Sequence, residues 1–134
     1  MIKYIIFDLD GVLVETKDIH FKALNKALIK TKKKYQISYT DHLKRFDGLP
    51  TKEKLLTLVK EKKISKNEIK NINDLKQRFT LSFLEKDVKF DKKIYDLFSK
   101  LSKNYSLAIA TNSINATLNT CIKNLKIKKF LKFY

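Results

Sequence analysis

Two short apolar segments of the chain predict buried β-strands. Residues 3–9 read Lys-Tyr-Ile-Ile-Phe-Asp-Leu and residues 105–110 read Tyr-Ser-Leu-Ala-Ile-Ala, and neither segment alternates strictly between polar and apolar positions. Runs of β-branched and aromatic residues of this kind are typical of parallel strands that are covered on both faces. The first segment ends at Asp10-Gly11, and Thr111-Asn112-Ser113 follows the second. We therefore expect two parallel strands, each buried on both faces.

Apolar residues elsewhere in the chain recur at helical spacing. This pattern predicts helices that begin near residues 16, 39, 51, 65, 91 and 114. The first of these helices ends in the lysine run Lys30–Lys34. Ser65 and Glu68 have the spacing of a capping box, and Thr51 and Asp91 are residue types that commonly cap a helix N-terminus. The last helix is expected to end near residue 126.

The order of these elements divides the chain into a core and an insert. A strand, several helices, a second strand and a final helix imply a βαβ core that is interrupted by helices. We expect an α/β fold with a Rossmann-like parallel sheet, incomplete at about two strands. The core would comprise residues 1–14 and 91–134, and an α-helical insert would comprise residues 15–90. A length of 134 residues suits one domain with such an insert.

Composition narrows the class of protein further. Hydrophobic residues make up 43% of the chain and charged residues 33%, which is too apolar for a disordered chain. No apolar run approaches the roughly 18 residues that a membrane-spanning helix needs, so no membrane partner is expected. The single cysteine, Cys121, permits no internal disulfide, and this indicates a cytoplasmic location.

The formal net charge of +16 could indicate a nucleic-acid partner. Only Arg45 and Arg78 are arginines, however, and the other basic residues are lysines scattered along the whole chain. Proteins that read bases or grip phosphates rely on the planar arginine fork. Nucleic acid is therefore an unlikely partner, and a basic nucleic-acid-binding module is kept as the weakest functional hypothesis.

Asp8 and Asp10 are the first candidates for chemistry because they stand at the C-terminal end of the first strand. Open α/β sheets place their ligand sites at this edge. Alternation along an extended segment puts the two carboxylates on the same side. Such a pair can hold Mg²⁺ through oxygen, or one residue can act as a nucleophile and the other as a general acid and base. The alternative is that Asp10-Gly11 is merely a turn that ends the strand.

The segments at residues 5–16 and 109–113 together resemble the haloacid dehalogenase superfamily of phosphatases and phosphomutases. The likeness is to the branch with a helical cap inserted after the first motif, which includes β-phosphoglucomutase and phosphoglycolate phosphatase. His20 on the first helix of the insert and Gly48 before another helix also look like that branch. The resemblance covers all 134 residues but matches only the N-terminal half of a member.

The resemblance implies a role for each residue of the two motifs. Asp8 would attack the substrate phosphorus and form an aspartyl-phosphate, and the carbonyl of Asp10 would join Asp8 in binding Mg²⁺. The side chain of Asp10 would protonate the leaving oxygen and then activate water. Thr111, with the amides of Asn112 and Ser113, would hold the transferring phosphoryl group at the start of the last helix.

The insert contributes further candidates by the same resemblance. His20 would face the active site and relay a proton to Asp10. Gly48 and Lys52 would contribute to substrate binding. Phosphomutases of this branch carry an arginine shortly after the glycine, whereas this chain has Thr51 and Lys52 there, which favours a phosphatase.

Two motifs of the superfamily, a lysine and a further acidic cluster, would follow a third strand, which we expect to begin just beyond Tyr134. Without them the chain would be weakly active or inactive, and its Mg²⁺ shell would be incomplete. The chain would then be a fragment, a broken reading frame or half of a split protein. Its core would be completed by a second chain, or it would self-associate through an unpaired sheet edge.

The leading hypothesis is a Mg²⁺-dependent phosphohydrolase that acts on a small phosphorylated metabolite. The alternative is a non-catalytic remnant of the same fold that acts as a binding or regulatory partner.

Overall fold

The computed structural model of the chain describes residues 2–31 and 35–134, so part of the lysine run, residues 32–34, lies outside the described residues. The chain forms two compact units. The sheet unit extends up to Thr16 and resumes at Leu81–Tyr134, and the helical unit is Lys17–Thr80. The expected insert of residues 15–90 is longer than this helical unit because the second boundary lies inside one continuous helix, α4 (Ile69–Asp87).

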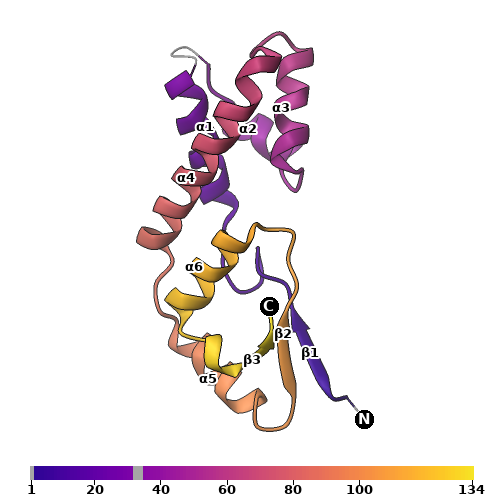
Figure 1. Cartoon of the computed structure of the whole chain (residues 1–134), viewed down its shortest axis with the longest axis vertical. Coiled ribbons are helices and arrows are strands. Elements are labelled where there is room, and N and C mark those ends of the chain that lie inside the picture. The colour runs from indigo at the N-terminus through magenta and orange to yellow at the C-terminus, as the bar shows by residue number, and fades with distance from the viewer. Residues whose placement is uncertain (1, 32–34) are drawn as a thin grey trace. The chain divides into compact units, whose positions relative to one another are not determined.

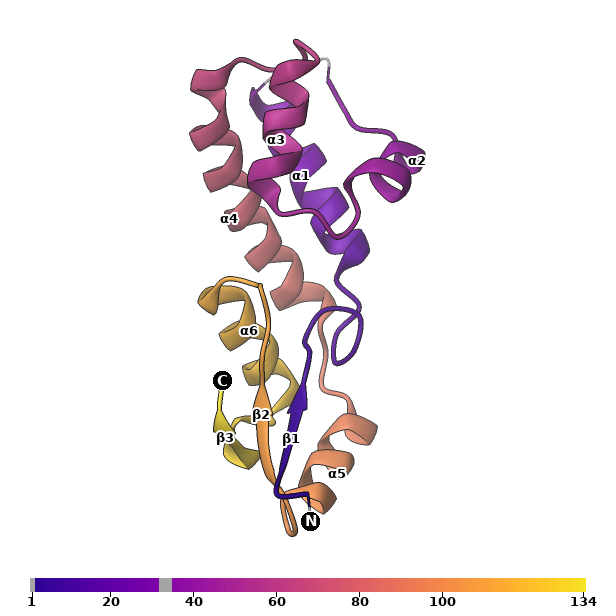
Figure 2. The same cartoon turned by 90° about the vertical axis from the view of Figure 1, so that its right-hand side faces the viewer.

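The sheet unit contains three parallel strands, β1 (Tyr4–Phe7), β2 (Ser106–Ile109) and β3 (Leu131–Phe133), in the order β1-β2-β3 (Figure 2). The expected adjacent, parallel pairing of the first two strands is confirmed. The expectation of about two strands, with a third beginning beyond Tyr134, is wrong. A single 3-10 turn, Lys128–Phe130, returns the chain to the sheet and makes the connection before β3 very short.

Two helices of the sheet unit, α5 (Lys92–Leu101) and α6 (Asn115–Leu125), lie on the same side of the sheet (Figure 1). Asp91 caps α5 as predicted, since its Oδ1 accepts hydrogen bonds from the amides of Lys93 at 2.8 Å and Ile94 at 3.2 Å. Helix α6 ends at Lys126, which has a left-handed backbone conformation with φ of 58°. Helix α5 connects β1 to β2 and α6 connects β2 to β3. Two right-handed crossovers in the same direction along the sheet place both helices on the same face.

The opposite face of the sheet is left bare by the described residues of the sheet unit. Ile6 pairs with Ala108, and Ala108 pairs with Phe133, so these three residues form one row across the sheet. Ile6 is 66% exposed and Phe133 is 59% exposed, whereas Phe7 on the other face packs against Phe98 of α5 with ring centroids 4.6 Å apart. The expectation that the first strand is buried on both faces is therefore wrong, because both helices cover one side.

The helical unit consists of short helices and most of α4. Its elements are α1 (Lys17–Thr31), α2 (Tyr39–Asp41), a π-helical turn (His42–Phe46), α3 (Thr51–Lys60), a 3-10 turn (Lys66–Glu68) and the first part of α4. The capping box is confirmed, since the Glu68 carboxylate accepts a hydrogen bond from the amide of Ser65 at 2.7 Å. The predicted cap at Thr51 is wrong by one residue, because Pro50 occupies the N-cap position and Thr51 is already helical.

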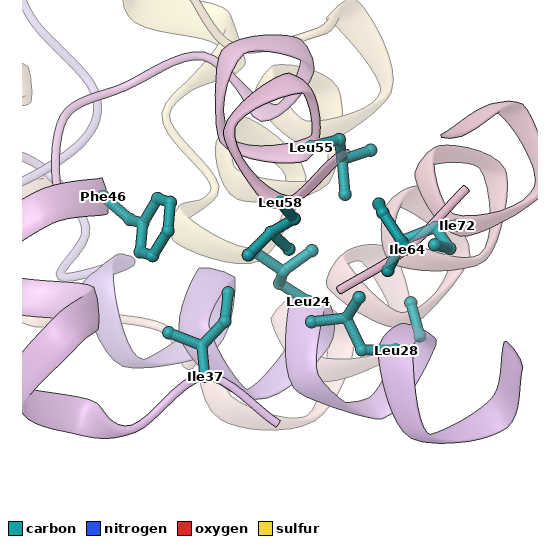
Figure 3. Close-up of a cluster of buried hydrophobic side chains, with 9 residues drawn as sticks. Leu24, Leu28, Ile37, Phe46, Leu55, Leu58, Ile64 and Ile72 are labelled. Carbon is teal, nitrogen blue, oxygen red and sulfur yellow. The ribbon is translucent and has the colours of Figure 1, made fainter. Parts of the chain in front are cut away.

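A hydrophobic core holds the helical unit together (Figure 3). Its buried members come from α1, α3, the π-helical turn, the start of α4 and the segments that connect these elements: Leu24, Ala27, Leu28, Ile37, Phe46, Leu55, Leu58, Ile64 and Ile72. The buried side chain of Asn25 donates to the carbonyl of Ile37 at 2.9 Å and accepts from its amide at 2.8 Å. This pair satisfies the backbone of an extended segment that has no ladder partner.

Across the described ranges, no helix of this chain is both long enough and apolar enough to cross a membrane.

Candidate active site

The loop after β1 is held by its own backbone. Leu9 is fully buried, and its carbonyl accepts hydrogen bonds from the amides of Leu13 at 2.9 Å and Val14 at 3.1 Å. Gly11 has φ of +75°, a conformation that side-chain-bearing residues rarely adopt. The chain therefore turns sharply after Asp10 and fixes that residue at the carboxyl end of β1.

The Asp10 carboxylate is the centre of a hydroxyl cluster. Thr16 donates to Oδ1, while Ser113 donates to Oδ2 at 2.7 Å and Thr111 donates to Oδ2 at 3.4 Å. Thr111 and Ser113 are more than 100 residues from Asp10 in sequence, and they meet it because β1 and β2 are parallel with Phe7 opposite Ile109. The structure thus brings three of the predicted site residues together.

The hydroxyl groups around Asp10 can stabilise its ionised form by donating hydrogen bonds. A carboxylate that receives O–H donors acts as an acceptor, so the cluster is matched to the ionised form. Thr16 is 2% exposed and was not predicted as a site residue. A threonine six residues after Asp10, at the beginning of a helix, was the available sequence signal for this contact.

The Thr111 hydroxyl also organises the loop that follows β2. Its oxygen accepts a hydrogen bond from the amide of Ser113 at 3.0 Å, in the manner of a short side-chain turn. Helix α6 begins two residues later, at Asn115, with Ile114 as an N-cap residue that offers no side-chain cap. Asn112 is exposed between the two clustered residues. Phosphoryl binding by these residues remains a prediction.

Asp8 directly follows β1 and is exposed. Its Oδ1 accepts a hydrogen bond from the amide of Leu9 at 2.7 Å, which orients the carboxylate. Its convergence with the hydroxyl cluster remains a prediction.

The residues present provide an incomplete set of metal ligands. Within the described part of the chain, no group of three or more His, Cys, Asp or Glu residues is gathered at one point. The Asp8 carboxylate and the Asp10 carbonyl are oxygen donors suited to Mg²⁺, but the near-octahedral shell of this ion needs more ligands than these two.

The predicted residues of the helical unit have different environments. His20 is half-buried on α1, Gly48 lies in a turn with φ of +74°, and Lys52 is exposed. The lysine of α3 that the structure buries is Lys54, at 8% exposure, and sequence reasoning missed it. Its position four residues before Leu58, on the apolar face of α3, was the available signal.

Cys121 on α6 is buried next to the site but is not reactive. Burial, with a smaller contribution from Asp10, raises the pKa of its thiol to about 11. The residue is thus a packed, protonated thiol at neutral pH.

Comparison with known proteins gives one family and a set of structural relatives. The model of the family described as haloacid dehalogenase-like hydrolase matches residues 5–134. Comparison with the curated proteins gives no match.

Three solved structures illustrate the likeness. A haloacid dehalogenase-like family hydrolase from Streptococcus pneumoniae is 25% identical with a TM-score of 0.74, and the match covers 98% of this chain and 60% of that one. A β-phosphoglucomutase from Clostridium difficile is 25% identical with a TM-score of 0.72, and the match covers 99% of this chain and 60% of that one. CbbY from Rhodobacter sphaeroides, solved with phosphate, is 18% identical with a TM-score of 0.82 and shares the fold. The match covers 99% of this chain and 62% of that one. This chain thus spans about three fifths of the length of each.

Proposed function

Because the chain belongs to the haloacid dehalogenase-like hydrolases, we propose that it provides the nucleophile and the general acid-base of a phosphohydrolase that acts on a small phosphorylated metabolite. The observation that carries this proposal is the Asp10 carboxylate, which receives hydroxyl donors from both motifs. The chain spans about three fifths of its structural relatives, so the proposal concerns the whole protein of which these residues form the site.

Asp8 is the proposed nucleophile. One of its oxygens is held by the amide of Leu9, which orients the other for attack on the substrate phosphorus. The new bond joins this oxygen to phosphorus, and the bond from phosphorus to the ester oxygen breaks. The product of this first step is an aspartyl-phosphate at Asp8.

Asp10 is the proposed proton carrier. It gives a proton to the departing ester oxygen in the first step, and in the second step it accepts a proton from the water that attacks the aspartyl-phosphate. The second step breaks the bond between Asp8 and phosphorus and releases inorganic phosphate. The hydroxyl donors of Thr16 and Ser113 stabilise the ionised form that Asp10 has between these events.

Thr111 and Ser113 are proposed to bind the phosphoryl oxygens, since their hydroxyls lie at the same carboxyl edge of the sheet as Asp10. Asn112 would add its amide to this set. Mg²⁺, held by the Asp8 carboxylate and the Asp10 carbonyl together with further oxygen ligands, would offset negative charge on the phosphoryl group when bound. A cytoplasmic location, with no membrane or nucleic-acid partner, completes the proposal.

A second candidate function is a non-catalytic binding or regulatory protein of the same fold. The comparisons do not favour it, because the family model that matches residues 5–134 describes hydrolases. The described residues nevertheless gather no cluster of three or more potential metal ligands. Loss of several electrostatic contributors is expected to cost about 10²–10³ in rate for each. On this ground we expect residues 1–134 alone to have negligible turnover.

The test uses acetyl phosphate and the protein in the longest form that its gene encodes. Acetate is a good leaving group and needs no acid, so Asp10→Asn is expected to form the phosphoenzyme but to release phosphate very slowly. Asp8→Asn is expected to form none, and Asp87→Asn, an exposed control in the same unit, is expected to behave as the parent. Acid-quenched labelling with radioactive phosphate measures both steps. Labelling of Asp8→Asn would overturn the proposal, and absence of labelling in every form would favour the non-catalytic candidate.

A further inference from the structure

Three aromatic side chains meet at the surface of the sheet unit. The Tyr95 ring of α5 makes T-shaped contacts with Phe90, at 5.5 Å between ring centroids, and with Phe130, at 5.2 Å. Phe90 precedes the cap residue of α5, and Phe130 belongs to the 3-10 turn before β3. Tyr95 and Phe130 are half-buried, whereas Phe90 is 46% exposed. Segments far apart in the sequence thus build one partly exposed aromatic cluster.

Two lysine side chains lie over the faces of these rings. The Lys129 Nζ is 5.1 Å from the centroids of both Tyr95 and Phe130. The Lys126 Nζ is 5.2 Å from the centroid of Phe90. An ammonium group within about 6 Å of a ring centroid is attracted by the negative face of the ring. The rings therefore hold both charges in place, although the two lysines are exposed.

Neighbouring acids do not balance the positive charge of this cluster. Among the described residues, neither Lys126 nor Lys129 forms an ion pair. The acids of α5 are already engaged, since Asp91 caps the helix and Asp96 is ion-paired within it. Residues 123–134 contain five lysines and no acidic residue. This surface therefore carries an excess of positive charge and attracts anionic groups.

The ring geometry distinguishes between the anionic partners that a basic aromatic surface attracts. Single-stranded nucleic acid stacks its bases on open aromatic faces, but here ammonium groups lie over the ring faces and the rings meet at their edges. A membrane surface is bound by apolar side chains that insert between the lipids, and two of the three rings are half-buried. Carboxylates can reach the ammonium groups from outside without displacing them from the rings. The arrangement thus favours an acidic polypeptide.

We propose that Phe90, Tyr95, Phe130, Lys126 and Lys129 form a docking surface for an acidic segment of a partner protein. The segment would place carboxylates on the two ammonium groups and an apolar side chain against Phe90. An exposed ion pair alone contributes little to affinity, but lysines that are already ordered over rings lose less freedom on binding. None of the five residues belongs to the hydroxyl cluster of the candidate active site, so the docking surface does not depend on the proposed reaction.

The experiment measures binding of a fluorescein-labelled peptide, Glu-Asp-Phe-Glu-Glu-Phe-Asp-Glu, by fluorescence anisotropy at low salt. The protein is used in the longest form that its gene encodes. A neutral peptide with Gln and Asn in place of Glu and Asp tests whether the carboxylates are recognised. Labelled oligo(dT) of the same charge, and vesicles of equal parts phosphatidylserine and phosphatidylcholine, test the other two classes of partner.

The double variant Lys126→Met with Lys129→Met should weaken binding of the acidic peptide by about tenfold, because two exposed ion pairs are lost. The control, Lys86→Met with Lys103→Met, removes the same charge from the same unit and should change the affinity by less than about twofold. Phe90→Ser should also weaken binding but leave its salt dependence unchanged, because no charge is removed. All five residues are exposed, so the variants should fold.

Equal losses in the two double variants would show that net charge alone binds the peptide and would overturn the proposal. Equal binding of the neutral peptide would overturn it as well, because the carboxylates would then not be recognised. Tighter binding of oligo(dT) or of the vesicles, lost in Lys126→Met with Lys129→Met, would replace the acidic polypeptide by a nucleic acid or a membrane.

Discussion

Asp10 shows how one residue can be specified by distant parts of the chain. Its carboxylate accepts hydrogen bonds from a threonine six residues later and from two hydroxyl groups in the loop after β2. A charged acceptor that is partly removed from water, as Asp10 is, is stabilised by donors that replace the lost water. The hydroxyls are therefore part of the fold as well as candidates for chemistry.

We expect Thr16→Val to reduce the free energy of unfolding by about 1.5–3 kcal/mol, since hydrogen bonds to charged groups have this strength. Valine has nearly the same shape as threonine but lacks the hydroxyl that donates to Asp10. Thr120→Val is the matched control, because the Thr120 hydroxyl is exposed and donates to a carbonyl of its own helix. Urea unfolding curves measure both changes. Equal effects of the two substitutions would mean that the contact with Asp10 contributes little.

His42 should make the helical unit sensitive to acid. Its pKa is lowered in the folded state, chiefly by burial, so the unfolded chain binds the proton more readily. The contribution to stability is fully present above the unfolded pKa of about 6.5 and is lost as pH falls through and below that value. We expect the free energy of unfolding to fall more steeply between pH 7.5 and 5.5 in the parent than in His42→Leu. Parallel pH dependences would contradict this assignment.

At the scale of elements, Lys126 carries a backbone conformation that its residue type disfavours. It ends α6 with φ of 58°, where glycine is the usual residue. Lys126→Gly is therefore expected to raise the free energy of unfolding by up to about 1 kcal/mol. Lys123→Gly, inside the same helix, should lower it by about 1 kcal/mol. Thermal unfolding of the two variants measures both changes in stability. Changes of opposite sign would show that the effect at residue 126 comes from its left-handed cap conformation and not from the general cost of glycine in a helix.

Local patterns sufficed to predict most of the elements. The Asp91 cap, the capping box at Ser65 and both long-range strands follow from residue types and spacing that act over a few residues. The proximity of Asp10 and Thr111 could also be predicted, because the carboxyl ends of adjacent parallel strands lie at the same edge of the sheet.

Other features depend on which surfaces meet, and residue types do not encode this. The apolar run of β1 predicts burial on both faces, yet both helices cover one face and Ile6 is exposed. The strand β3 has only three residues, too few for periodicity to detect. Lys54 reads as a solvated charge in the sequence, and only the packing of α3 shows that it is buried.

At the scale of the whole molecule, the sheet unit has one covered face and one bare face. The row Ile6, Ala108 and Phe133 gives the bare face an apolar centre, and Tyr4 beside it is 53% exposed. About two fifths of each matched solved chain lies outside the part that aligns with these residues. An apolar sheet face of this kind usually lies against another segment or another molecule.

We expect the 134-residue chain to self-associate through this face, with a second copy as the partner. Each copy carries a formal charge of +16, so the repulsion between copies opposes an apolar contact. Salt screens this repulsion, since the Debye length falls from about 10 Å at 0.1 M to 3 Å at 1 M. Association measured by sedimentation velocity should therefore strengthen as sodium chloride is raised, the opposite of an interface held by ion pairs.

Ile6→Lys combined with Phe133→Ser should abolish this association, because both residues are exposed and the substitutions remove the apolar row without altering the covered face. The control is Ile29→Ser, which removes an exposed isoleucine from the helical unit. It should leave the sedimentation profile unchanged at every salt concentration. Association that weakens with salt, or that persists in the double variant, would place the contact elsewhere, on the charged surface of the molecule rather than on its bare sheet.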